Sequence, residues 1–319
     1  MSPVLEQLKE DYGDQVRLIF RHLPLISIHD NALVSSEAAE AAGAQGKFWE
    51  MHDLLFAKQD EWSDLGEEAV IEQFVAYAQE VDVPDVAQFQ ADLENSTYED
   101  KVMAAYEAAT GAGLSSTPTV LYNRIDYPVQ ALGFAYQNLE MFIKLMELRA
   151  GWYDGPEQVI DPEKEYQATI ETDKGEIVVE LFPDTAPVNV NSFAFLAQED
   201  YYQDATFHRV LPGFVAQGGD PTGTGIGFPG YRCGDEVTPE RQFDEAGLVA
   251  LANSGPNTNG SQFFITYGPA PNLNTGFTII GQVIEGLDVA EQLTPRDPQT
   301  DPTAEPGDKI IDIVVEEKN

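Results

Sequence analysis

The chain has 319 residues, of which 55 are acidic and 17 are basic, so its formal net charge is −38. Hydrophobic residues make up 43% and aromatic residues 10% of the sequence, which is enough for packed cores and excludes a wholly disordered chain. A surface of this charge repels phosphate backbones and anionic lipid headgroups, so we expect neither nucleic acid nor a membrane surface as partner. At about 150 residues per domain, the length predicts two domains.

Three further features of the sequence exclude other classes of protein. The sequence shows no apolar run of the ~18 residues that a membrane span requires, and its first residues do not form a charged-then-apolar leader, so neither membrane insertion nor a signal peptide is predicted. The single cysteine, Cys233, allows no intrachain disulfide and no CxxC pair. The 4 histidines lack metal-ligand spacing, so we expect no metal and no cofactor.

Residues 1–150 are predicted to be mainly helical around a little strand. A short helix begins near Pro3, and the apolar run Val16–Phe20 suits a buried strand. Helical periodicity then dominates residues 30–112. A strand entered through proline is predicted at Thr117–Tyr122, and a last helix buries Phe142 and its neighbours.

The pattern changes after residue 150. Residues 151–165 contain glycine, prolines and acids with little periodicity, which indicates a linker before a second domain at residues 166–319. That domain alternates apolar and polar residues in short runs with glycine-rich loops between them, and it contains one clear helix that begins at Pro187. Many short strands with few helices favour a closed barrel.

Two segments of the second domain hold its most informative residues. They are Phe207–Asp220 (FHRVLPGFVAQGGD) and Leu251–Ile265 (LANSGPNTNGSQFFI). They contain no nucleophile triad, carboxylate pair or phosphate loop, but they combine aromatics with one arginine, two glutamines and an asparagine. Such residues could line an apolar pocket with a few oriented donors.

These two segments, with GFTIIGQVIEG further on, resemble the signature blocks of the cyclophilins, and the resemblance runs from about Tyr166 to Lys318. It implies an eight-stranded antiparallel barrel capped by helices, and peptidyl-prolyl cis-trans isomerase activity on proline-containing unfolded or extended polypeptides. It also implies residue roles. The catalytic arginine would be Arg209 with Gln217 as its amide partner, and the residues that bind the substrate would be Phe214, Val215, Ala252, Asn253, Gln262, Phe264, Leu273 and Phe277.

Two positions depart from the best-known eukaryotic pattern. Asn272 stands where those members have a tryptophan important for cyclosporin, and Phe277 stands where they have a pocket histidine. We therefore expect isomerase activity with weak cyclosporin binding. Because the domain is so acidic, we also expect acidic client segments to be disfavoured.

Residues 1–150 resemble the DsbA-like branch of the thioredoxin fold. The resemblance rests on VRLIFRHLPL, on EAAEAAGAQGKFWEMHDLLF and on STPTVLYN, and it implies an α/β domain with a helical insertion. It also makes Pro118 a candidate cis-proline. The first strand and the CxxC segment of that family are missing from this sequence. Either the chain is shortened or the domain has lost its redox chemistry; the first is favoured, because a missing central strand leaves backbone groups unpaired.

Three functions remain open from the sequence. The first is a peptidyl-prolyl isomerase in protein folding, and the second is a proline-peptide binding or chaperone module without turnover. The third is part of a longer disulfide oxidoreductase-isomerase fusion. Arg209 favours the enzyme, since a binding module needs the pocket more than the guanidinium. Both resembled families are commonly exported in bacteria, which suggests an extracytoplasmic location, although a cytoplasmic one stays open.

Overall fold

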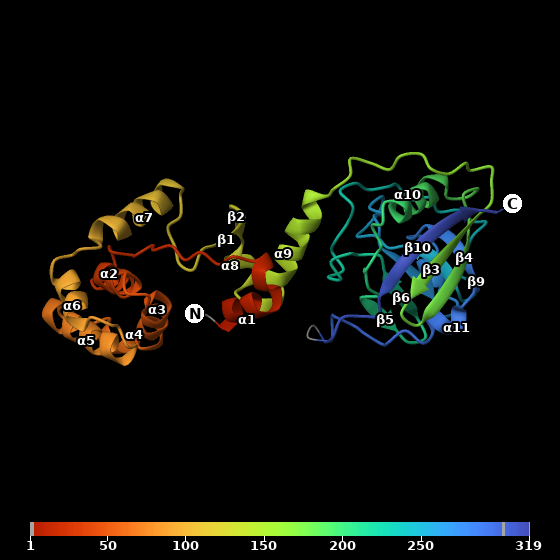
Figure 1. Cartoon of the computed structure of the whole chain (residues 1–319). Coiled ribbons are helices and arrows are strands. Elements are labelled where there is room, and N and C mark those ends of the chain that lie inside the picture. Colours follow the sequence, from red (N-terminus) through yellow and green to blue (C-terminus); the bar gives the residue numbers. More distant parts are fainter. Residues whose placement is uncertain (1–2, 302–303, 319) are drawn as a thin grey trace. The chain divides into compact units, whose positions relative to one another are not determined.

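The structure, a computed structural model, describes residues 3–301 and 304–318. By its contacts the chain divides into two compact units, residues 1–140 and 141–319 (Figure 1). The helix α9 (Tyr136–Ala150) carries the chain from one unit into the other. In the part of the chain that the structure describes, no helix is both long and apolar enough to cross a membrane.

The first unit is a helical bundle with one small sheet. Its core is built on the alanine-rich face of α2, where Ala38, Ala41 and Ala42 are fully buried and let neighbouring helices approach closely. Met51 and Phe74 fill the space against them. The helices and strands of the unit are α1 (Pro3–Tyr12), η1 (Gly13–Gln15), α2 (Ala32–Gly43), α3 (Phe48–Ala57), α4 (Gln59–Trp62), α5 (Glu67–Glu80), α6 (Val86–Glu94), α7 (Glu99–Gly111), β1 (Val120–Tyr122), β2 (Ile125–Tyr127) and α8 (Val129–Leu132).

The strand predicted at Val16–Phe20 is wrong. Residues 16–25 form neither helix nor strand, and the side chains of Ile19 and Phe20 are 55% and 36% exposed. A buried strand needs a neighbour that pairs its backbone groups, and β1 pairs with β2 instead. The strand predicted at Thr117–Tyr122 is shorter than expected and begins at Val120, after a cis peptide bond between Thr117 and Pro118, the geometry that the sequence suggested.

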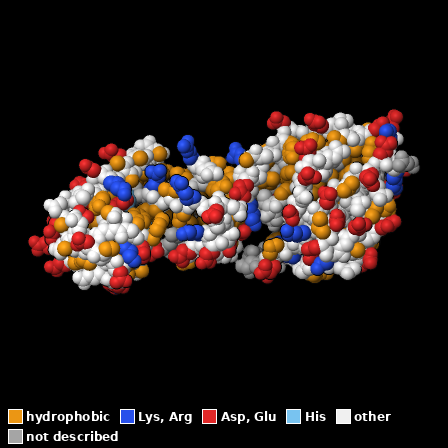
Figure 2. All heavy atoms as spheres, viewed as in Figure 1, with side chains coloured by type: hydrophobic (Ala, Val, Ile, Leu, Met, Phe, Trp, Pro, Cys, Tyr) orange, Lys and Arg blue, Asp and Glu red, His pale blue; other side chains and the backbone are white. Residues whose placement is uncertain are grey.

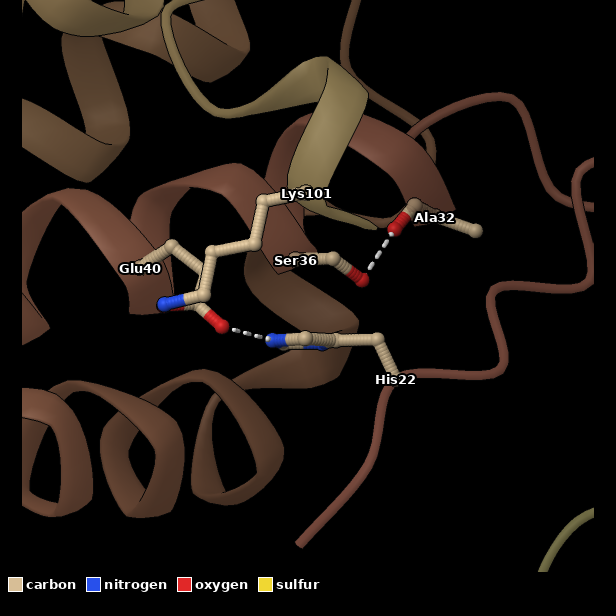
Figure 3. Close-up of polar contacts among 5 residues, drawn as sticks. All are labelled: His22, Ala32, Ser36, Glu40 and Lys101. Carbon is tan, nitrogen blue, oxygen red and sulfur yellow. Dashed lines mark hydrogen bonds and ion pairs between the residues drawn. The ribbon is translucent and has the colours of Figure 1, made fainter. Parts of the chain in front are cut away.

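A cluster of polar side chains lies on and beside α2 (Figure 3). His22 Nε2 lies 3.2 Å from Glu40 Oε1, and Lys101 pairs with the other oxygen of the same carboxylate. Beside them the hydroxyl of Ser36 donates to the carbonyl of Ala32 over 2.9 Å. Burial lowers the pKa of His22, while the charge of Glu40 opposes that shift. The chain just after the segment that was expected as a strand is thus held to α2 by the side chain of His22.

The second unit is one curled antiparallel sheet of eight strands with short helices. The strand order is β10-β3-β4-β9-β7-β8-β6-β5. Its elements are β3 (Tyr166–Thr172), β4 (Gly175–Leu181), α10 (Pro187–Gln198), β5 (Arg209–Leu211), β6 (Val215–Gly218), β7 (Leu248–Leu251), β8 (Phe263–Thr266), η2 (Pro271–Leu273), β9 (Ile279–Glu285), α11 (Leu287–Ala290) and β10 (Ile310–Glu317).

Backbone hydrogen bonds join the two ends of this sheet. Phe207 N donates to Asp308 O over 2.9 Å, and Ile310 N donates to Ala205 O over 2.7 Å. The residues next to β5 therefore meet the start of β10, which curls the sheet toward a closed barrel. The eight-stranded antiparallel architecture expected from the resemblance is confirmed.

The core of the second unit follows from the alternation of its strands. Ala168, Ile170, Ile177 and Val179 point inward from β3 and β4 and are essentially buried, while their neighbours face outward. The helix α10 covers this core, and Phe193 packs edge-on against Phe263 of β8. With its inward side filled, the sheet can present functional side chains only on its other surface and in its loops.

Residues 151–165 form no helix or strand. They are nevertheless bonded to the rest of the second unit: Tyr153 N donates to Pro229 O over 2.9 Å, and Val159 N donates to Asn191 Oδ1 over 2.8 Å. Acidic side chains are scattered over the visible faces of both units instead of forming one tract (Figure 2). This distribution agrees with the even spread of acids along the sequence.

Candidate active site

The register of three adjacent strands brings the predicted site residues into one row. Arg209 on β5 stands opposite Gln217 on β6, and Gln217 stands opposite Phe264 on β8. Residues directly opposite each other in antiparallel strands share a face of the sheet, and neighbouring strands lie about 4.8 Å apart. The guanidinium, the amide and the aromatic ring therefore emerge side by side on the same face, although they are up to 55 positions apart in the sequence.

An apolar cluster surrounds Phe264, and we name it the Phe264 cluster. Phe264 and Val215 are 5% and 4% exposed, and the ring of Phe264 meets that of Phe277 edge-on at 5.4 Å. The predicted members that the structure brings together here are Phe214, Val215, Ala252, Phe264, Leu273 and Phe277. Four of them are only partly buried, so the cluster keeps apolar surface that a ligand can cover.

Three amide side chains border this cluster. Gln217 Nε2 donates to Gln262 Oε1 over 3.0 Å, and Gln262 Nε2 donates in turn to the carbonyls of Gly225 and Gly227 over 2.9 and 3.0 Å. Asn253 Nδ2 donates to Gly276 O over 2.8 Å. Loop carbonyls thus fix the orientation of Gln262 and Asn253, and Gln262 in turn fixes Gln217, as a binding surface for an extended peptide requires.

The loop that orients Gln262 is itself organised by a buried carboxylate. Asp220 is fully buried, and its Oδ2 accepts from the backbone N–H groups of Gly225 and Gly227 over 2.7 and 3.0 Å. Its Oδ1 accepts from both the backbone and the hydroxyl of Thr222. Directly before it, Gly219 has φ +83°, and a Cβ there would come within 2.6 Å of the Ser261 carbonyl, so only glycine fits.

The histidine beside the arginine faces the interior. His208 is 2% exposed, and burial lowers the pKa of its imidazole, an effect that the charge of Asp220 opposes. Phe207 and Phe263 are fully buried in the core. Cys233 is also buried, and burial raises the pKa of its thiol, so the thiolate is disfavoured. These neighbours of the site offer packing and no nucleophile or base.

Three neighbours of the site carry no signal in the sequence. Asp297 Oδ1 lies 3.8 Å from Arg209 Nε, although 87 residues separate them along the chain. Phe243 is fully buried and stacks on Phe264 with ring centroids 5.9 Å apart. Arg241 lies over the ring of Phe182, another member of that packing, with its guanidinium carbon 3.6 Å from the centroid. Loops bring these residues to the site, and hydrophobic periodicity in the sequence does not predict where a loop runs.

Within residues 3–301 and 304–318, no group of three or more His, Cys, Asp or Glu side chains is placed to hold a metal ion. The groups that the site brings together are an arginine, fixed amides and an apolar surface. A reaction served by such groups needs charge stabilisation and positioning, and neither a nucleophile nor a proton acceptor.

Comparisons with known proteins agree with this geometry. The family model described as cyclophilin type peptidyl-prolyl cis-trans isomerase/CLD matches residues 167–315, and the model described as thioredoxin matches residues 1–134. The peptidyl-prolyl cis-trans isomerase A of Mycobacterium tuberculosis is 47% identical over 161 residues, which cover 45% of this chain and 87% of that protein. The isomerase ppi1 of Schizosaccharomyces pombe is 46% identical over 127 residues, covering 39% of this chain and 82% of that protein.

A solved structure is also similar. The cyclophilin type peptidyl-prolyl cis-trans isomerase of Cryptosporidium parvum is 37% identical, with a TM-score of 0.45, and the match covers 49% of this chain and 99% of that one. The cyclophilin match lies within the second unit, and the thioredoxin match lies within the first. The chain therefore belongs to the cyclophilin-type peptidyl-prolyl cis-trans isomerases.

Proposed function

We propose that Arg209 is the catalytic group of this isomerase. Rotation about an X-Pro bond meets a barrier of about 18–20 kcal/mol, because amide resonance resists twisting. As the bond twists, the lone pair returns to the prolyl nitrogen, and a guanidinium held nearby stabilises it. The observation that carries the proposal is the row formed by Arg209, Gln217 and Phe264, which sets a cation beside an apolar surface on one face of the sheet.

The remaining residues of the site bind two different parts of the peptide, the proline ring and the flanking backbone. The Phe264 cluster grips the pyrrolidine ring, since its partly buried members lose water when a ring covers them. Gln217, Gln262 and Asn253 hydrogen-bond the flanking peptide backbone, because their amides already lie fixed at the border of the cluster. The substrates are proline-containing unfolded or extended polypeptides, whose X-Pro bonds isomerise over tens to hundreds of seconds unaided.

Two variants of one residue test this assignment. Arg209→Ala should lower kcat/KM on an Ala-Pro peptide by about 100-fold, the typical loss when an electrostatic donor is removed. Arg209→Lys should recover only part of that activity, because the ammonium keeps the charge but loses the planar fork. Circular dichroism should show an unchanged fold, since the side chain is 27% exposed. Near wild-type turnover in Arg209→Ala would contradict the assignment.

We also propose weak cyclosporin binding. Asn272 lies in η2 next to Leu273, and Phe277 packs against Phe264, so the two positions that depart from the eukaryotic pattern both adjoin the Phe264 cluster. A small polar amide at Asn272 offers much less apolar contact than the indole of a tryptophan.

We further propose that the thioredoxin-like domain is of the DsbA-like branch and that the protein assists folding outside the cytoplasm. The six helices α2–α7 between α1 and β1 support the first point, because that branch inserts a helical subdomain. The resemblance of both domains to exported fold-helpers supports the second. Cell fractionation with an antibody to the full chain tests the location, and a purely cytosolic signal would exclude it.

A further inference from the structure

The carboxylate of Asp297 is the charge partner of Arg209. Asp297 Oδ1 lies 3.8 Å from Arg209 Nε, and the two side chains are 24% and 27% exposed. The Nε atom is buried, and among the described residues it has no hydrogen-bond partner. The contact is therefore an ion pair beyond hydrogen-bond distance, at the edge of the site and partly open to water.

The loop that carries Asp297 is bonded directly to the strand of Arg209. The backbone N–H and C=O of Arg296 exchange hydrogen bonds of 2.9 and 2.7 Å with Val210. The guanidinium of Arg296 donates to the carbonyl of His208 and, over 2.8 Å, to that of Glu305. The loop is thus attached on both sides of Arg209.

The turn that follows Asp297 holds its carboxylate in place. Gln299 N donates to Asp297 Oδ1 over 3.2 Å, and the N–H groups of Thr300 and Asp301 donate to the carbonyl of Asp297 over 3.1 and 2.9 Å. Because the backbone supplies these bonds, the position of the carboxylate does not depend on the weak ion pair alone. A fixed negative charge consequently stands beside the guanidinium before any peptide arrives.

We propose that Asp297 sets the charge preference of the site and directs it to peptides with a cationic residue next to the proline. This rests on the proposed function, in which Arg209 meets the peptide. An arginine without a counter-ion would attract a Glu or Asp beside the proline. Asp297 cancels that attraction, and the surrounding surface, with 29 acidic against 8 basic residues in 151–319, then favours Lys or Arg.

The experiment measures kcat/KM of the full chain on three peptides that differ only in the residue before proline: Lys, Ala or Glu. In wild type the Lys peptide should be turned over faster than the Glu peptide. Asp297→Asn should lower the Lys-to-Glu ratio by about 3- to 10-fold, the effect of one unit charge at close range in partly screened surroundings. The change should shrink in high salt. Asp297→Glu should keep the wild-type preference.

Glu305→Gln is the matched control. Glu305 is an exposed acid in the same loop, and its described contact is made by its backbone carbonyl. It should leave the ratio within twofold of wild type. An unchanged ratio in Asp297→Asn, an equal loss on all three peptides, or an equal shift in Glu305→Gln overturns the proposal. Failure of the proposed function is distinct, since it shows as wild-type turnover of the Ala peptide in Arg209→Ala.

Discussion

Gln217 and Gln262 are joined amide to amide, with Gln217 Nε2 donating to Gln262 Oε1 over 3.0 Å. Gln262 Nε2 in turn donates both of its hydrogens to the carbonyls of Gly225 and Gly227. An amide that donates in two directions can present only its oxygen to Gln217, so the second glutamine fixes the orientation of the first. The orientation of the Gln217 amide, which stands opposite Arg209, is therefore fixed by a loop outside the sheet.

The hydrogen bonds that run from Gln217 through Gln262 to the two loop carbonyls form a relay. Replacing Gln262 with Glu should break this relay while keeping a side chain of nearly the same size. A carboxylate cannot donate, so it would face two backbone carbonyls with negative charge and lose both bonds. We expect kcat/KM on a neutral Ala-Pro peptide to fall by about tenfold, as two buried hydrogen bonds are lost. Gln292→Glu, on a side chain that donates to Asp288 O over 2.9 Å at an exposed position, is the control. Equal activity in the two variants would exclude the relay.

Replacing the buried Asp220 should lower the free energy of unfolding. It is fully buried and accepts from two backbone N–H groups and from Thr222. In Asp220→Asn an NH₂ group would face some of these donors, and the unpaired groups should cost about 3 kcal/mol of the free energy of unfolding. Urea unfolding of the full chain measures this. Thr222→Val removes the hydroxyl that donates to Asp220 Oδ1 and that also bonds to Thr224, so it should cost about 1–2 kcal/mol. A larger loss there than in Asp220→Asn would refute the order.

More of the second domain than of the first could be predicted from the sequence, because its strands and site residues are encoded by residues that lie close together in the chain. FHRVLPGFVAQGGD holds β5, the turn and β6, so the pairing of Arg209 with Gln217 is already fixed within one local hairpin. The alternation of apolar and polar residues that begins at residue 166 likewise locates β3 and β4. These elements owe their structure to residues close in sequence, which periodicity describes.

Asp297 and Phe243 could not be found in the same way. Each comes from a loop whose path depends on contacts elsewhere: the backbone of Arg296 bonds one loop to Val210 of β5, and Phe243 stacks on a ring from β8. Polar and aromatic residues in loops carry no period, so the sequence does not say which ones return to the site. At Val16–Phe20 the apolar run predicted a strand, yet pairing depends on a neighbour that an apolar pattern does not supply.

The weak cyclosporin binding that we propose has a direct test at Asn272. Asn272→Trp should lower the inhibition constant of cyclosporin by about tenfold or more, because an indole adds a large apolar contact beside Leu273. Turnover of the Ala-Pro peptide should change little. Asn274→Trp would disrupt the hydrogen bond that Phe243 N donates to Asn274 Oδ1, so the milder control is Asn274→Gln, with unchanged inhibition. Submicromolar inhibition of the wild type would contradict the proposal.

The last prediction concerns Glu37, a buried acid in the thioredoxin-like domain. It lies on α2 and is 3% exposed, and burial, followed by the charge of Glu99, raises its pKa from 4.5 to about 7. The folded state therefore holds this proton more tightly than the unfolded state. Protonated Glu37 therefore contributes its full stabilisation below pH 4.5. This contribution is lost as the pH rises to 7, and the free energy of unfolding falls by up to about 3 kcal/mol.

Glu37→Gln should consequently be more stable than wild type at pH 8 and nearly equal to it at pH 4.5, as followed by urea unfolding with the fluorescence of Trp49 and Trp62. His52, whose pKa burial lowers to about 4, acts in the opposite direction, because its stabilising effect is lost as the pH falls from 6.5 to 4. That loss is common to both proteins and cancels in their difference. Glu72→Gln, at an exposed position in the middle of α5, is the control and should give a difference that does not vary with pH. If Glu37→Gln were instead less stable than wild type at pH 8, the carboxylate would be stabilised by its neighbours and the sign assigned here would be wrong.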